Sequence, residues 1–137
     1  MDQDFVPIRQ FQAKQSTIPG AGTGLFTTRE LLINQPLFIA FAPRGDNRQL
    51  HNQYNQISKA EGNLKPVFEA EYQQCYPNDF INHSEQPNCE SIWDGDYIVV
   101  RAIKVIAPGE ELFKDYRHTM ELIEVRGFVM VDDFLNF

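Results

Sequence analysis

Short apolar segments separated by Gly, Pro and Asn turns run through most of this chain, and they constrain its fold more than any other feature. Alternating, β-branched or aromatic residues predict strands at 11–17, 37–41, 90–93 and 97–103, and a short strand that opens at 25–26. Because helices do not alternate with these strands, a nucleotide-binding α/β fold is disfavoured. The pattern predicts a mainly β protein with few helices and long connections.

Two turns and one helix can be predicted in more detail. Asp94-Gly95 suits a type I′ hairpin turn between two strands, because both central residues of that turn need positive φ. Pro108-Gly109 suits the central positions of a type II turn. Residues 119–126 predict a short helix, with Thr119 as its N-cap and Gly127 at its end.

The chain has 137 residues, which is the size of one domain. We expect a single domain over residues 1–137. Residues 46–75 are predicted to be a variable insert, because their first part is polar and carries one narrow helical stripe. Residues 118–137 are predicted to be a C-terminal tail that packs on the domain.

The formal net charge is −7. This charge argues against direct nucleic-acid binding, which relies on Lys and Arg beside phosphates. It suits a basic protein or peptide as partner, and it equally suits simple solubility. No apolar run approaches the ~18 residues of a membrane span, so we expect no membrane partner.

Cys75 and Cys89 are the only cysteines, and they predict free or buried thiols in a reducing compartment. No Cys-x-x-Cys or His-x3-His spacing is present, so no metal site is expected. Residues 1–10 show no secretory signal. These features predict an intracellular protein, cytoplasmic or, in a eukaryote, nuclear.

Three segments could carry chemistry. Residues 20–26 place glycines at every second position, and successive bare amides can face an anion, although a plain tight turn is the simpler interpretation. Residues 79–89 run from an apolar pair into Asn-His-Ser and Pro-Asn, which could equally be a capped polar turn. Residues 108–116 end in a tyrosine beside a carboxylate, whose charge can shift the tyrosine pKa.

In this order and at about this spacing, the three segments resemble the signatures of the SET-domain family. Those signatures are Gly-x-Gly-x-Gly-Leu-Phe, Arg-Phe-Ile-Asn-His-Ser-x-x-Pro-Asn-Cys and Gly-Glu-Glu-Leu-Thr-Phe-Asp-Tyr. The resemblance covers about residues 8–117. It implies a SET-type (β-clip) fold of several small sheets, in which the Asn-His-Ser segment and the strand entering Glu-Leu cross in a pseudoknot.

The resemblance also implies an enzyme that transfers a methyl group from S-adenosylmethionine to a lysine of a basic protein or peptide. Tyr116 would be the catalytic tyrosine, and Glu111 would help to hold the pseudoknot. The cofactor would be bound by the following residues: Gly22, Thr23, Gly24, Leu25, Asn82, His83 and Tyr116.

Three departures from the family pattern bear on these expectations. Lys114 replaces the usual Phe or Tyr of the substrate-lysine channel, and we expect its charge to reach solvent while its stem lines the channel. Asp79 stands where Arg is frequent, and the cysteines that follow some SET domains are missing, so zinc is not expected. Lys114 favours an alternative, a SET-like module without turnover that binds a peptide or partner. A non-lysine methyl acceptor is a third interpretation.

Overall fold

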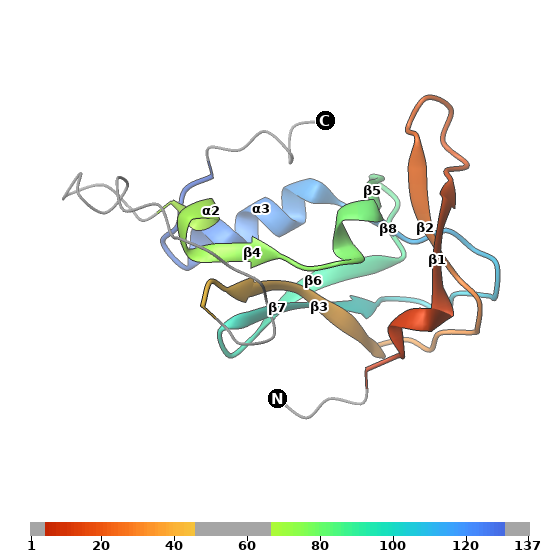
Figure 1. Ribbon diagram of the computed structural model, residues 1–137, viewed down its shortest axis with the longest axis horizontal. Coiled ribbons are helices and arrows are strands. Elements are labelled where there is room, and N and C mark those ends of the chain that lie inside the picture. The colour runs from red at the N-terminus through yellow and green to blue at the C-terminus, as the bar shows by residue number, and fades with distance from the viewer. Residues whose placement is uncertain (1–4, 46–66, 131–137) are drawn as a thin grey trace.

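Three small sheets and few helices make up the described part of the protein, as the sequence predicts (Figure 1). The computed structural model describes residues 5–45 and 67–130. Strands β1 (Phe11–Gln15) and β2 (Thr23–Thr27) form an antiparallel pair at one end of the molecule. β2 begins two residues earlier than expected, and the loop between the strands holds Gly20 and Gly22 at positive φ.

The central sheet has four strands in the order β4-β3-β7-β6. Their bounds are Pro36–Pro43 for β3, Tyr72–Gln74 for β4, Cys89–Asp94 for β6 and Tyr97–Ala102 for β7. All neighbouring strands in this sheet are antiparallel. The predicted strands at 37–41, 90–93 and 97–103 are therefore confirmed.

The hairpin turn between β6 and β7 differs from the prediction. Asp94 pairs with Tyr97, so the central residues are Gly95 and Asp96 rather than Asp94 and Gly95. Gly95 has φ 61°, whereas Asp96 does not have positive φ. This is the φ pattern of a type II′ turn, in which only the first central residue, here the glycine, needs positive φ. The type II turn at Pro108-Gly109 is as expected, with φ 87° at Gly109 and a hydrogen bond from Glu110 N–H to the Ala107 carbonyl.

Strands β5 (Asn82–His83) and β8 (Phe113–Lys114) form a parallel pair. They bring together the two segments that the family resemblance places in a crossing. Asn88 reinforces the contact, because its Nδ2 donates to the Glu111 carbonyl at 2.8 Å and its Oδ1 accepts from Phe113 N–H at 2.8 Å. The Asn88 side chain thus provides hydrogen-bond partners for the backbone of residues 111 and 113, beside the short β5–β8 pair.

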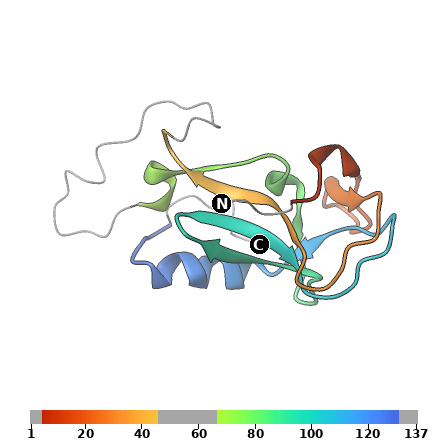
Figure 2. The same ribbon diagram turned by 90° about the horizontal axis from the view of Figure 1, so that it is seen from below.

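Helix α3 (Tyr116–Val125) begins three residues before the predicted start. Its N-cap is Asp115, whose carboxylate accepts a hydrogen bond from Arg117 N–H at 2.9 Å. Thr119, the predicted cap, instead lies buried inside the helix. Gly127 follows the last turn with φ 89°, as expected for a helix end. Figure 2 shows α3 along one face of the central sheet, where its Leu122 carbonyl accepts from the Trp93 indole at 2.7 Å.

Short helical segments elsewhere in the described residues escape the sequence prediction. They are η1 (Ile8–Gln10), α2 (Phe68–Glu71) and η2 (Asn78–Phe80). None is long enough to show a helical period, which explains why the pattern did not reveal them. In the described part of the chain, no helix is long and apolar enough to cross a membrane.

Part of the predicted insert belongs to the core. The Phe68 ring is 1% exposed and stacks on Tyr72 at a centroid distance of 4.7 Å. It also meets Phe41 and Phe128 edge-on at 5.1 and 5.6 Å. Residues 67–75 therefore complete the central sheet, whereas 46–66 lie outside the described residues. Phe128 fits the predicted packing of the tail, of which residues 131–137 are likewise outside the description.

Phe68→Ala is expected to lower the free energy of unfolding by about 3–5 kcal/mol, because it empties a ring-sized site in the core. Val125→Ala is the control, since Val125 is 84% exposed and its replacement is expected to change stability by less than about 0.5 kcal/mol. Urea unfolding followed by circular dichroism measures both. Equal stabilities of the two variants would mean that residues 67–75 are an appended segment rather than core.

Candidate active site

The Glu111 carboxylate is the centre of the polar network between the three motifs. The side chain is only 4% exposed. Its Oε1 accepts from Thr17 N–H at 2.8 Å and from Thr17 Oγ1 at 2.7 Å. Its Oε2 accepts from Ser16 Oγ at 2.8 Å and from Asn82 Nδ2 at 3.2 Å. One carboxylate thus connects the end of β1, the start of β5 and the approach to β8.

Hydrogen bonding decides the ionisation of this carboxylate. Burial by itself raises the pKa of Glu111, but the hydrogen bonds from Thr17, Ser16 and Asn82 outweigh burial and lower it below its usual range. Glu111 is therefore ionised at neutral pH and accepts from all of these donors. This geometry agrees with the role in holding the crossing that the family resemblance implies.

The glycines of the loop have two different functions. Gly20 and Gly22 have φ near +80°, and a methyl group at either would meet nothing within 4 Å. Gly24 does not have positive φ, but a Cβ there would collide with the Glu111 carboxylate. Gly20 and Gly22 thus shape the loop, whereas Gly24 leaves room for the buried charge.

Gly22 and Thr23 are exposed, whereas Gly24 and Leu25 are buried. Leu25 is a core residue, and its carbonyl accepts from Leu112 N–H at 2.8 Å. Of the four loop positions expected to hold a cofactor, Gly22 and Thr23 are therefore the accessible ones. An open groove of about 590 Å³ runs beside them, lined by Ala13, Lys14, Gln15, Ser16, Ile18, Gly20, Gly22 and Thr23.

Asn82 lies between the loop and the network. Its Nδ2 donates to the Thr23 carbonyl at 3.1 Å and to Glu111. These bonds orient the amide, so its Oδ1 faces away from both partners. No described residue donates a hydrogen bond to that oxygen. The half-buried amide thus offers an acceptor for a ligand beside Thr23.

His83 and Tyr116 form a second contact between the motifs. His83 Nδ1 accepts from Tyr116 N–H at 3.0 Å, and the two ring centroids are 5.2 Å apart. An imidazole that accepts through Nδ1 is unprotonated at that nitrogen. The Tyr116 hydroxyl donates to the Ile81 carbonyl at 2.5 Å. Burial raises the pKa of Tyr116, so the phenol stays neutral at physiological pH.

Lys114 does not reach solvent, contrary to the sequence prediction. Its side chain is 3% exposed, and its Nζ donates to Asn78 Oδ1 at 2.6 Å and to Ser91 Oγ at 2.9 Å. β8 is only two residues long, and the chain turns directly into α3. The lysine stem therefore points inward, where two neutral oxygens receive its amine.

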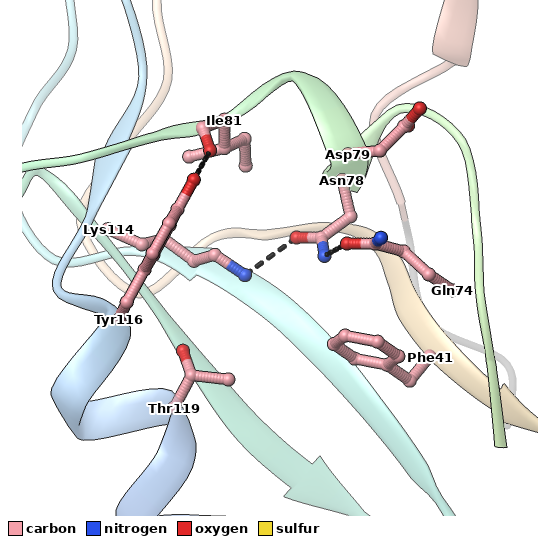
Figure 3. A pocket seen from close by; sticks show the side chains of 8 residues that line it. All are labelled: Phe41, Gln74, Asn78, Asp79, Ile81, Lys114, Tyr116 and Thr119. Carbon is pink, nitrogen blue, oxygen red and sulfur yellow. Dashed lines mark hydrogen bonds between the residues drawn. The ribbon is translucent and has the colours of Figure 1, made fainter. Parts of the chain in front are cut away.

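The amine lies at a cavity of about 100 Å³ (Figure 3). Its lining residues are Phe41, Gln74, Asn78, Asp79, Ile81, Lys114, Tyr116 and Thr119. Lys114 and Tyr116 thus line one pocket, and the exposed Asp79 stands on its wall. Burial lowers the pKa of Lys114 to about 7.

Asn78 and Ser91, which accept hydrogen bonds from the Lys114 amine, are among the site residues that the sequence analysis missed. Ser91 occupies a buried position of β6 between Cys89 and Trp93, and a polar residue on the inward face of a strand is a usable signal. Asn78 lies in a Pro-Asn-Asp segment, which offers no such signal. No group of three or more His, Cys, Asp or Glu residues that could hold a metal occurs among residues 5–45 and 67–130.

Gly24→Ala is expected to lower the free energy of unfolding by at least about 3 kcal/mol, because the methyl group would displace Glu111 from its donors. Gly22→Ala is the matched control and should cost about 1–2 kcal/mol, from backbone strain alone. Chemical denaturation of both variants measures the difference. If the two glycines prove equally replaceable, the carboxylate does not need the space at Gly24.

The comparisons with known proteins agree with this geometry. The model of the SET domain family matches residues 22–117. The fold is similar to a Plasmodium falciparum protein with a provisional assignment as a histone methyltransferase, with TM-score 0.53 and 16% identity over 78% of this chain and 92% of that one.

It is also similar to a humanized mutant of the Chaetomium thermophilum Polycomb Repressive Complex 2 bound to an inhibitor, with TM-score 0.52 and 19% identity. This match covers 77% of the present chain but only 14% of the other. No curated protein matches the chain significantly. Because the family model spans most of the sequence and includes the second and third motifs and residues 22–26 of the first, the protein belongs to the SET-domain family.

Proposed function

We propose that this protein is an S-adenosylmethionine-dependent protein-lysine methyltransferase acting on a basic protein or peptide. The observation that carries the proposal is the meeting of three distant motifs at one place. Asn82 contacts Thr23 and Glu111, and His83 contacts the first residue of α3, Tyr116. Family membership supports methyl transfer as the reaction.

The residues around the loop fit the cofactor chemically. Backbone groups of the exposed residues Gly22 and Thr23 would face its carboxylate, and the free acceptor Asn82 Oδ1 suits its ammonium group. His83 would stay in place through its bond to Tyr116 N–H. When bound, S-adenosylmethionine supplies an electrophilic methyl group on a sulfonium.

The protein's own contribution is positioning and exclusion of water. The neutral Tyr116 hydroxyl offers an oxygen at the shared pocket, where partial positive charge is stabilised by nearby dipoles. A narrow buried pocket favours the neutral form of an incoming amine and holds it in one orientation. The net charge of −7 favours a basic substrate, and the similarity to one protein provisionally assigned as a histone methyltransferase supports a protein substrate.

One observation favours a second function. The Lys114 amine lies in the pocket that would admit the substrate lysine, so a module that binds a peptide without turnover is the alternative. Transfer of labelled methyl groups from S-adenosylmethionine to basic peptides and lysate proteins separates the two. Cys75 and Cys89 are not joined in a disulfide, which supports our proposal of an intracellular, reducing location.

Asn82→Ala is expected to weaken S-adenosylmethionine binding by about 1–3 kcal/mol, because a ligand group loses its acceptor. Calorimetry measures the affinity, and thermal unfolding shows whether the variant is folded. Gln86→Ala is the matched control, since this amide belongs to the same motif but is exposed. If wild type binds neither S-adenosylmethionine nor its demethylated product, the cofactor assignment is wrong.

Tyr116→Phe is expected to lower kcat by about 10²–10³ while cofactor binding persists, because one preorganised hydroxyl is lost beside the reacting atoms. Tyr76→Phe removes a hydroxyl from an exposed ring and should leave kcat unchanged. Single-turnover methyl transfer to a basic peptide gives the rates. Equal rates for wild type and Tyr116→Phe would reduce Tyr116 to a packing residue.

A further inference from the structure

The Lys114 amine is buried without a counter-charge. In the described part of the chain, its hydrogen-bond partners are the neutral side chains of Asn78 and Ser91, and it forms no ion pair. A buried ammonium with neutral partners is costly, whereas a neutral amine is not. Figure 3 shows the lysine stem passing the Tyr116 ring, with Nζ directed toward Asn78.

The hydrogen-bond network determines which N–H groups of the Lys114 amine are already bound to a partner. Asn78 Nδ2 donates to Gln74 Oε1 at 2.6 Å, so Asn78 Oδ1 is the oxygen that faces Lys114 and can only accept. Ser91 Oγ also receives the amine, and Thr119 Oγ1 lies 3.3 Å from it. A neutral amine has two N–H groups and one lone pair. Both N–H groups are occupied, which leaves the lone pair for a ligand in the pocket.

The charged and titratable groups around Lys114 leave this neutral form populated near physiological pH. Burial raises the pKa of the Cys89 thiol on β6 to about 12, and the Tyr116 phenol on α3 is neutral as well. Asp79 lies exposed on the wall of the pocket, and Asp115 uses its carboxylate to cap α3. Desolvation therefore dominates and lowers the pKa of Lys114 to about 7.

We propose that Lys114 is a catalytic base that accepts the proton of the substrate amine in the pocket it shares with Tyr116. This inference rests on the proposed methyltransferase function. The pocket of about 100 Å³ is small, so an amine that reaches Tyr116 also meets Lys114. A lysine at position 114 would thus assist the reaction of the substrate amine rather than block its entry into the pocket.

The step is a single proton transfer. An N–H bond of the substrate ammonium breaks, and its electron pair stays on the substrate nitrogen as the nucleophilic lone pair. The lone pair of Lys114 Nζ forms the new N–H bond, and the resulting ammonium keeps Asn78 and Ser91 as acceptors. Lys114 later releases this proton to water, which restores the neutral amine.

The proposal predicts a defined pH profile. Below pH 7 Lys114 is protonated and repels the substrate, so kcat/KM should fall about tenfold per pH unit. Above pH 7 the profile should level off. Lys114→Met should lower kcat/KM at pH 8 by about 10²–10⁴ and remove the plateau, so that the rate rises toward the ordinary lysine pKa of about 10.4.

The test measures kcat/KM for methyl transfer to one basic peptide between pH 6 and 10, for wild type, Lys114→Met and Lys114→Gln. Lys104→Met is the matched control, because Lys104 is exposed and outside the pocket. Lys114→Gln retains hydrogen-bonding capacity toward Asn78 and Ser91, so it keeps the test valid if Lys114→Met does not fold. Calorimetric binding of S-adenosylmethionine should be the same for all folded variants.

A second measurement does not depend on turnover. Titration of the lysine side chains by NMR, with the Lys114 signal assigned from Lys114→Gln, should show a midpoint near 7 for the Lys114 amine. A midpoint near 10 overturns the proposal. Lys114→Met or Lys114→Gln with the same kcat/KM as wild type at pH 8 would also overturn it, because Lys114 would then not accept the proton of the substrate amine. Absence of methyl transfer by wild type at every pH overturns the proposed function itself.

Discussion

The ionised carboxylate of Glu111, buried among hydrogen-bond donors, holds the candidate site together. Removal of a carboxylate from water costs several kcal/mol, and donors from Ser16, Thr17 and Asn82 offset that cost. These donors belong to segments that are far apart in the sequence. The carboxylate can therefore be satisfied only when the glycine loop and the Asn-His strand are both in place. The same contacts that make the charge tolerable also set the spacing of the site, for which Gly24 provides the room.

Lys114 is the counterpart of Glu111 on the same short segment. Both side chains are buried, but Glu111 is surrounded by donors that favour its charged form, whereas Lys114 meets two neutral oxygens. The two groups consequently reach different states: hydrogen-bond donors keep Glu111 ionised despite its burial, whereas burial favours the neutral form of Lys114. Glu111 and Lys114 are three residues apart in the sequence. Glu111 contacts the glycine loop, where the cofactor is proposed to bind, whereas Lys114 lines the pocket proposed for the substrate amine.

Local patterns in the sequence predicted the fold well where one face of a strand is buried. The alternation at 90–93 and 97–103 and the Pro-Gly turn at 108–109 have local causes, and they are confirmed. Residues 67–75 could not be assigned because their position depends on pairing with β3, a distant partner. The motifs indicated Asn82, His83 and Tyr116, but the direction of Lys114 could not be predicted. It depends on Asn78 and Ser91, which chain folding brings to the pocket from two other elements.

The parallel pairing of β5 with β8 has a consequence for how the protein is made. Asn82 pairs with Phe113, and Ser16 reaches across a sequence separation of 95 residues to Glu111. Such non-local contacts require the closure of long loops before they contribute stability, and this slows folding. During synthesis, the glycine loop and the Asn-His strand emerge well before the segment that joins them. The central sheet can begin to assemble on the ribosome, but the site becomes complete only after β8 has left the exit tunnel.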